Sequence, residues 1–563
     1  MRVEIRLEFN HLFRDEKKEQ ALVYLQKLSK KSVEEIVGFF TTHTLPDYHN
    51  FFSNPVLQED INKRIFNYVY DNKIKGNVNL VSREGSLHLA EIIFSNKENL
   101  IDNNNNPEDR DTEELCLFKA FLVINESINK SNNLTVESTE DNIQKIAEIF
   151  VALKFPSADL GVFEDVGFEL LKLGYATSFR FEKLLEFLSS KEELSYLLDD
   201  ICSYFNQDNI EKLKKQVDYL IVQILRFRQN NSYKYKVEDE DSSRFLDSLC
   251  ADEIVEDADF LGLRNHPLYK IDESTYSITD PFFVLDKFTK SIKFILKESY
   301  NRRNGYLESD GRFFSWFNKD FSEEYLMKQL LDGIFAKKYF IKAKSDVGDE
   351  RKPDYYVRYN NDLYVFEYKD VLFKKEVKIS GNIELILDTL RKKLLFDPTD
   401  QRAVGIGQLI NHIRAINEDK FIYDDKIDLT KKNSVFPVLL LSDRLLEIPG
   451  INFILNVWFR ENLQGNLGKL AVKDLCVLDI DTLILLESYL KIKDRNFKDL
   501  LTSHINKMNM DYKGYGSTLK EFEENFIRKV SEKLNPFAGR ISSNYFNPNG
   551  FLGRFSYLVN DKL

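Results

Sequence analysis

Apolar side chains recur at three- and four-residue intervals through most of the first 230 residues, which is the spacing of one face of an α-helix. The pattern runs through 16–40, 113–127, 142–154 and 181–228. Two polar stretches interrupt it, 101–112 with its run of asparagines and 229–243 with its acidic end, and both are typical of surface loops or linkers. No repeat of fixed period stands out. We therefore expect a helical N-terminal region.

The pattern changes in the second half of the chain. Residues 266–297 suggest two short strands around a turn, followed by a helix or a pair of strands. From about residue 306, helices are expected at 320–340, 382–395 and 402–417, and strands at 354–359, 363–369, 435–441 and 475–480. Strands that alternate with helices predict an α/β sheet covered on both faces. The tail, 484–563, is helical and then rich in Asn, Gly and Phe.

A chain of 563 residues is too long for one hydrophobic core, so the sequence predicts several domains. The expected organisation is multidomain, α followed by α/β. A helical sensor or scaffold region covers 1–244, a connecting subdomain covers 245–305, an α/β domain covers 306–483, and a helical C-terminal extension covers 484–563.

The composition indicates a globular protein and argues against several other classes. Apolar residues make up 43% of the chain and charged residues 30%, a globular balance, and the net charge of −12 argues against non-specific coating of nucleic acid. Four scattered cysteines show no zinc spacing and suit a reducing compartment. The N-terminus alternates charged and apolar residues, unlike a signal peptide, and no apolar run approaches the ~18 residues of a membrane span. We expect a soluble, cytoplasmic protein without a membrane partner.

The segment 353–369 carries the most specific chemistry. Asn360 and Asn361 suit a two-residue hairpin turn, because Asn tolerates positive φ. With that turn, Asp354 lies directly opposite Glu367 in the hairpin. Side chains two apart on a strand share a face, so Lys369 projects beside Glu367.

Two facing carboxylates repel each other, and a bound divalent cation removes that cost. Carboxylate oxygens suit Mg²⁺ or Mn²⁺, which lower the pKa of bound water and stabilise charge that develops on a phosphate. A nearby ammonium group orients the attacking water and offsets phosphate charge. Asp354, Glu367 and Lys369 thus supply the kinds of group that phosphodiester hydrolysis requires.

Pro353-Asp354, followed by Glu367-Tyr368-Lys369, resembles the motif of the PD-(D/E)xK nuclease superfamily. The resemblance covers roughly 310–445 and implies a restriction-endonuclease-like domain with a mixed central sheet. It implies that the two acids and the backbone carbonyl of Tyr368 bind the metal, and that Lys369 assists the water. It also implies a further acidic ligand on the preceding helix. Glu323 and Glu324 are the two candidates, and Glu324 is preferred.

The RecB-like members add a helix that carries a catalytic Gln, and Gln408 takes that position here. His412 lies one turn further on, where an aromatic residue is common, and it is expected to be a packing or surface residue. Between hairpin and helix lies a basic strip that could hold nucleic-acid phosphates. Its members are Lys374, Lys375, Lys378, Arg391, Lys392, Lys393 and Arg402.

The function expected from this resemblance is that of a Mg²⁺- or Mn²⁺-dependent deoxyribonuclease, an endonuclease by preference, in bacterial anti-phage defence or restriction. Alternatives are an RNase of the same fold, and a nucleic-acid-binding scaffold or sensor whose nuclease-like domain is inactive or awaits a partner. No ATP-binding motif is present, so an ATPase or sensor would be a separate protein. Homo-oligomerisation stays open. Asp479 and Asp481 are expected to cap a helix at 482–491 rather than to bind metal.

Overall fold

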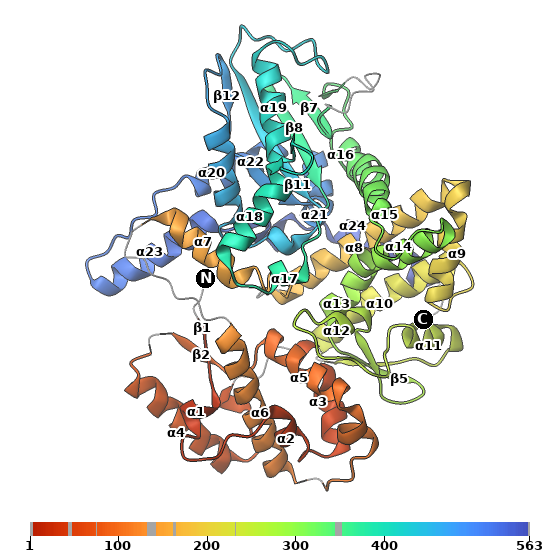
Figure 1. The fold of residues 1–563 in the computed structure, drawn as a ribbon, viewed down its shortest axis with the longest axis vertical. Coiled ribbons are helices and arrows are strands. Elements are labelled where there is room, and N and C mark those ends of the chain that lie inside the picture. The colour runs from red at the N-terminus through yellow and green to blue at the C-terminus, as the bar shows by residue number, and fades with distance from the viewer. Residues whose placement is uncertain are drawn as a thin grey trace. The chain divides into compact units, whose positions relative to one another are not determined.

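The computed structural model of the chain describes residues 4–42, 48–74, 76–107, 109–131, 142–160, 165–230, 232–343 and 352–560. The backbone forms two compact units (Figure 1). The N-terminal unit comprises residues 2–133 and 162–306, and the C-terminal unit comprises residues 134–161 and 307–562. Each unit is therefore assembled from two separate stretches of chain.

The N-terminal unit is mainly helical, as the spacing of apolar residues predicts. Phe118, Phe121 and Leu122 of its helix α6 are fully buried, so this helix passes through the core. The helices are α1 (Phe9–Leu12), α2 (Ala21–Leu25), α3 (Lys30–Thr42), α4 (Pro55–Asp71), α5 (Arg83–Ser95), α6 (Arg110–Ser131), α8 (Val166–Ser189), α9 (Ser195–Tyr204), α10 (Ile210–Asn230), α11 (Glu240–Asp247), α12 (Leu261–Asn265), α13 (Pro281–Asp286) and α14 (Ile292–Arg303).

Two small sheets complete this unit. β1 (Glu4–Arg6) pairs in parallel with β2 (Asn77–Asn79). β3 (Lys234–Lys236), β4 (Leu268–Lys270) and β5 (Thr275–Ile278) form an antiparallel sheet in the order β3-β5-β4. The two strands predicted within 266–297 are therefore confirmed as β4 and β5.

Three expectations for this half are corrected. The helical pattern of 16–40 becomes two helices, and Gly38 at φ 84° interrupts the second. The expected loop at 229–243 contains β3, because this short segment completes a sheet with β5. Residues 245–305 belong to the N-terminal unit and form no separate subdomain. Their strands β4 and β5 share a sheet with β3, and their helix α13 packs against α8.

The C-terminal unit is built around a mixed sheet in the order β12-β11-β8-β7-β6, and β13 also pairs with β11. β6–β7 and β7–β8 are antiparallel, whereas β8, β12 and β13 each pair with β11 in parallel. The strands are β6 (Ile341–Lys342), β7 (Tyr355–Tyr359), β8 (Asp362–Lys369), β11 (Asn433–Leu441), β12 (Leu470–Val472) and β13 (Cys476–Asp479). The chain is thus mixed α/β overall.

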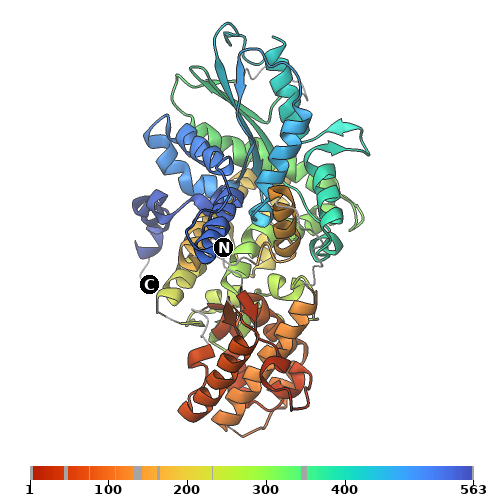
Figure 2. The ribbon, with the colours of Figure 1, turned by 90° about the vertical axis from the view of Figure 1, so that its left-hand side faces the viewer.

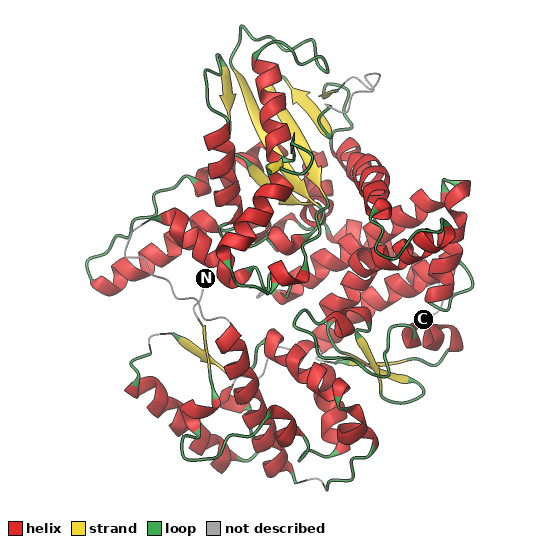
Figure 3. Cartoon of the chain, viewed as in Figure 1, coloured by secondary structure: helices red, strands yellow, loops and turns green. Residues whose placement is uncertain are grey.

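Helices cover both faces of this sheet (Figures 2 and 3). Leu363 and Val365 of β8 pack into a core with α7, α18, α19 and α20. On the opposite face, Tyr364 and Phe366 form an aromatic cluster with Phe335 and Phe497. The helices are α7 (Ile143–Lys154), α15 (Arg312–Trp316), α16 (Lys328–Ile334), α17 (Lys375–Lys378), α18 (Ile383–Leu394), α19 (Ile406–Asn417), α20 (Ile451–Asn462), α21 (Ile480–Ile492), α22 (Asn496–Met508), α23 (Leu519–Leu534), α24 (Pro548–Phe555) and α25 (Tyr557–Asn560).

Several boundaries differ from those expected for this half. The helix predicted to reach 340 ends with α16 at Ile334, and the helix predicted from 402 begins at Ile406, because 402–403 form β10 (Arg402–Ala403) in a short ribbon with β9 (Phe396–Asp397). The tail at 484–563 is no separate extension. Its helices α21 and α22 pack against α16 and β13, respectively, and lie in the C-terminal unit.

The segment that contains α7 also differs from expectation. Residues 142–160 fall within the region 1–244, yet they belong to the C-terminal unit. Ala147, Val151 and Phe155 are fully buried there, in the same core as Leu363 and Val365 of β8. The apolar face of α7 is thus covered by strands and helices that come much later in the sequence.

Among the described residues, no helix is long and apolar enough to cross a membrane.

Candidate active site

The hairpin predicted at 353–369 is formed by β7 and β8. Tyr359 pairs with Asp362 and Tyr355 pairs with Phe366, which is the predicted register. Asn360 in the turn has a φ of 53°, the left-handed conformation that Asn tolerates. Asp354 directly precedes β7 and continues this register to lie opposite Glu367. The predicted register is therefore confirmed.

Three charged groups of the hairpin meet at the end of β8. Lys369 Nζ lies 3.2 Å from Glu367 Oε2 and 3.4 Å from Asp354 Oδ2. The backbone N–H of Tyr368 donates a 2.7 Å hydrogen bond to the same oxygen of Asp354 and holds this carboxylate against the strand. Glu367 is fully buried. The structure thus brings the predicted acid–acid–lysine set together.

The helix before the hairpin contributes Glu323 to this cluster. The middle of this helix, between α15 and α16, is a π-helical segment, η5 (Phe317–Met327). Glu323 is half-buried, and it is close enough to Asp354 for the charge of that carboxylate to raise its pKa. Glu324 is exposed and pairs with Lys328 at 3.5 Å. The preference for Glu324 is therefore wrong. The wider turn of a π-helix shifts the angular position of each residue, which an α-helical pattern does not anticipate.

A pair of hydrogen bonds ties η5 to the end of β8. Asn318 Nδ2 donates to the backbone carbonyl of Asp370 at 3.0 Å, and Ser322 Oγ donates to Asp370 Oδ2 at 3.1 Å. Ser322 precedes Glu323, and Asp370 follows Lys369. These contacts hold the two elements of the cluster in register. The sequence contains no pattern that would have singled them out.

Burial and mutual repulsion alter the acidity of the cluster. Burial, followed by the charge of Glu367, raises the pKa of Asp354 to about 7. Burial, followed by the charge of Asp354, raises the pKa of Glu323 to about 8. Burial also raises the pKa of Glu367. Burial disfavours the charged form of Lys369, but the surrounding carboxylates outweigh it and raise its pKa above the ordinary value. The carboxyl groups therefore retain protons unless further positive charge is supplied.

Helix α19 contributes His412 to the cluster. His412 is buried, and its Nε2 lies 3.0 Å from Glu367 Oε1. Burial lowers its pKa to about 4, so the imidazole is neutral near pH 7. The sequence marks the position of His412 but not this contact, because the separation of α19 from β8 is set by the tertiary fold.

Gln408 lies one turn before His412 on α19. Its Oε1 accepts a 2.8 Å hydrogen bond from the backbone N–H of Gly405 and so caps the start of the helix. Within the described part of the chain, Gln408 makes no hydrogen bond to the carboxylate cluster. The structure thus gives Gln408 a local role and leaves its predicted catalytic role as a proposal.

The predicted basic strip is only partly available to a phosphate. Lys378 is buried and forms a 2.9 Å ion pair with Asp159, so it is removed from the strip. Lys374 is exposed, Lys375 is half-buried, and Arg391 is exposed and lies over the ring of Trp458. Lys393 is half-buried, and burial followed by the charge of Lys374 lowers its pKa. Lys392 and Arg402 form exposed ion pairs with neighbouring aspartates.

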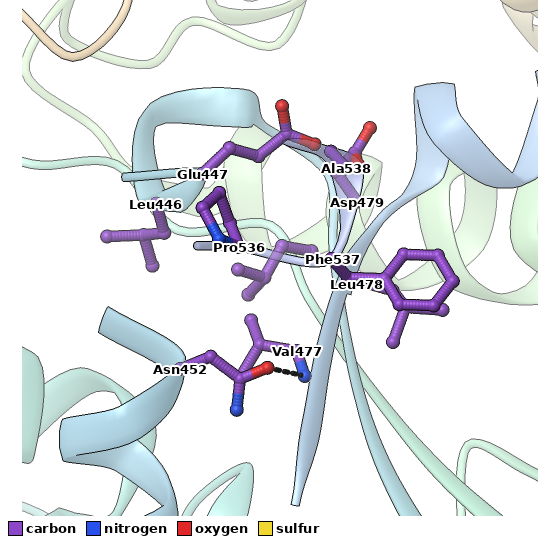
Figure 4. A pocket seen from close by; sticks show the side chains of 10 residues that line it. Leu446, Glu447, Asn452, Val477, Leu478, Asp479, Pro536, Phe537 and Ala538 are labelled. Atoms are coloured by element: carbon purple, nitrogen blue, oxygen red, sulfur yellow. Dashed lines mark hydrogen bonds between the residues drawn. The ribbon is translucent and has the colours of Figure 1, made fainter. Parts of the chain in front are cut away.

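Asp479 has the predicted structural role. Its Oδ1 accepts a hydrogen bond from the backbone N–H of Thr482, and it is the N-cap of α21. Beside it lies a small cavity, bounded by Asn452, Val477 and Phe537 among others (Figure 4). Its volume of about 10 Å³ holds roughly one water molecule. This cavity is too small for a nucleotide.

The chemical types of the side chains in the cluster suit a divalent cation, although their present positions do not form a metal site. Within the described ranges, no group of three or more His, Cys, Asp or Glu side chains is arranged to hold a metal ion. Lys369 Nζ lies between the carboxylates instead. The donors themselves are oxygen ligands of the kind that Mg²⁺ and Mn²⁺ prefer. Their raised pKa values show that additional positive charge would be favourable there.

Comparisons of the chain with protein-family models, curated proteins and solved structures give no significant match.

Proposed function

We propose that this protein is a metal-dependent nuclease that hydrolyses phosphodiester bonds, with DNA as the favoured substrate. The observation that carries the proposal is the convergence of Glu323, Asp354 and Glu367 around Lys369. Glu323 comes from a helix, Asp354 from the residue before β7, and Glu367 and Lys369 from β8. The resemblance of 353–369 to the PD-(D/E)xK motif supports the same assignment. It also supports a restriction-endonuclease-like fold for the sheet of the C-terminal unit.

The three carboxylates and the backbone carbonyl of Tyr368 would hold Mg²⁺ or Mn²⁺. When bound, such an ion lowers the pKa of water and stabilises negative charge on a phosphate. Lys369 would orient the attacking water and offset charge on the phosphate. Lys374, Lys375, Arg391, Lys392, Lys393 and Arg402 would hold backbone phosphates, and Gln408 would assist from α19.

The biological setting belongs to the same proposal. A large helical region joined to a nuclease-like domain is similar to bacterial anti-phage and restriction proteins, an analogy of architecture only. In that setting the N-terminal unit would sense a signal or bind a partner, and a separate ATPase or sensor protein would complete the system. The nuclease would act in the cytoplasm.

A second candidate is a nucleic-acid-binding protein that does not cut. The observation in its favour is the position of Lys369, which neutralises the carboxylates in the place where a cation would bind. In this case the basic residues would bind phosphates, while the acidic cluster would serve only to hold β8 against η5.

The test is cleavage of plasmid, linear and single-stranded DNA and of RNA, with Mg²⁺, Mn²⁺ or EDTA. We expect cleavage that EDTA abolishes and that falls by about 10²-fold or more in Asp354→Ala and in Lys369→Ala. Asp362→Asn is the matched control, because Asp362 lies at the far end of β8 and pairs with Lys498. Cleavage that persists in both site variants would reject the assignment, and binding without cleavage would favour the second candidate.

A further inference from the structure

The two carboxylate oxygens of Glu367 have different partners. Oε2 lies 3.2 Å from Lys369 Nζ, on the side of Asp354. Oε1 lies 3.0 Å from His412 Nε2, on the side of α19. Glu367 is fully buried and His412 nearly so. The contact therefore restricts the rotation of the carboxylate about its last bond.

His412 differs in kind from the other buried side chains of α19. Leu409, Ile410, Ile413 and Ile416 are buried apolar residues that face the core of the unit. A position needed only for packing would be filled by a side chain of the same kind, because burying a polar ring is costly unless it is hydrogen-bonded. The hydrogen bond to Glu367 is the contact that offsets this cost.

We infer that His412 is a positioning residue, which holds Glu367 Oε1 and so directs Oε2 toward Asp354 and the place of a divalent cation. The inference rests on the proposed function. A metal ligand must be ionised, and an ionised carboxylate only accepts hydrogen bonds. His412 Nε2 therefore carries the hydrogen and donates it to Glu367. Partners of this kind orient metal ligands, and their loss weakens metal binding by about 10–100-fold.

The test compares three substitutions in the full chain. The amide nitrogen of Gln reaches about as far from the backbone as His Nε2, whereas that of Asn stops near the position of Nδ1. We expect His412→Asn and His412→Leu to lower the affinity for Mn²⁺, measured by titration calorimetry or electron paramagnetic resonance, by about 10-fold or more. We expect His412→Gln to restore it. If the Leu variant does not fold, the comparison of Gln with Asn gives the answer.

His504→Leu is the matched control. His504 is also buried in the C-terminal unit, and its Nε2 contacts Asn452 Oδ1 at 2.8 Å, in a network that includes Arg540 and not the carboxylate cluster. Its loss should lower thermal stability but leave the affinity for Mn²⁺ unchanged.

Two outcomes would overturn the positioning role. One is wild-type affinity for Mn²⁺ in His412→Asn while Glu367→Gln has lost it. The other is an equal loss in the Gln, Asn and Leu variants, which would indicate packing alone. Both leave the proposed function intact. Binding of Mn²⁺ that is equal in the wild type, Asp354→Ala and Glu367→Gln would instead reject the proposed function itself.

Discussion

At the scale of single residues, the fold changes the chemistry of Asp354 and Glu323 most clearly. An ordinary Asp side chain has a pKa of 3.8 and an ordinary Glu side chain a pKa of 4.5. Burial, with the neighbouring carboxylate second, raises these values to about 7 and about 8. The cluster is therefore a place where the folded chain holds protons that the unfolded chain has already released.

This difference predicts how stability depends on pH in the absence of divalent cations. Between about pH 4 and pH 8, the folded chain binds more protons at Asp354 and Glu323 than the unfolded chain, so the free energy of unfolding should decrease as the pH rises through this window. Thermal unfolding in EDTA at about pH 5.5 and about pH 8.5 measures the decrease, and Asp354→Asn should reduce it. An unchanged pH dependence in that variant would contradict the raised pKa.

Glu323 and Glu324 form a natural pair of variants at the same scale. Glu323→Gln removes a carboxylate whose charge interacts with that of Asp354, whereas Glu324→Gln removes one that is exposed and pairs with Lys328. We expect Glu323→Gln to weaken Mn²⁺ binding and cleavage by about 10-fold or more, and Glu324→Gln to stay close to wild type. The opposite ranking would mean that the other face of η5 is directed toward the metal.

At the scale of elements, the turn between β7 and β8 sets which residues face each other. A two-residue turn fixes the pairing, and a shift of one residue would move every side chain of the strand to the opposite face. Glu367 and Lys369 would then point into the aromatic cluster around Phe335. The geometry of the site thus depends on Asn360 and Asn361, which take no part in the chemistry.

Substitutions at Asn360 test this dependence. Its φ of 53° is accessible to Gly and Asn but strained for β-branched residues. Asn360→Val should therefore destabilise the protein by about 1–2 kcal/mol, and Asn360→Gly should be nearly neutral. Urea-induced unfolding measures both. Equal stability of the two variants would show that the turn does not have the left-handed conformation.

At the scale of the whole molecule, the chain assembles the C-terminal unit from two separated segments. α7 buries Ala147, Val151 and Phe155 in the core that also contains Leu363 and Val365 of β8. Asp159, after α7, forms the buried ion pair with Lys378 next to the basic residues. The segment 142–160 is thus part of the unit that contains the candidate active site.

A shortened chain tests this arrangement. A fragment of residues 307–563 lacks α7, so it exposes apolar surface and leaves Lys378 without Asp159. We expect low solubility or a less cooperative thermal transition, and recovery when residues 134–161 are fused to its N-terminus. Circular dichroism and size-exclusion chromatography distinguish the two fragments. A fragment 307–563 that is as stable as the fused form would show that α7 is dispensable.

The local pattern of residues was sufficient for the hairpin and the helical character of the N-terminal half. Turn chemistry and the two-residue period of a strand are local properties, so Asp354, Glu367 and Lys369 could be placed on one face without knowledge of the fold. The cap at Asp479 is local for the same reason.

Other features depend on contacts between segments that are distant in the sequence, and only the three-dimensional structure revealed those contacts. The contact of His412 with Glu367 requires the packing of α19 on β8. The place of α7 in the C-terminal unit depends on core residues more than 200 positions further along the chain. Glu323 and Glu324 lie in a π-helical segment, a conformation that apolar periodicity does not reveal. A residue pattern determines which faces are apolar, whereas packing determines what covers them.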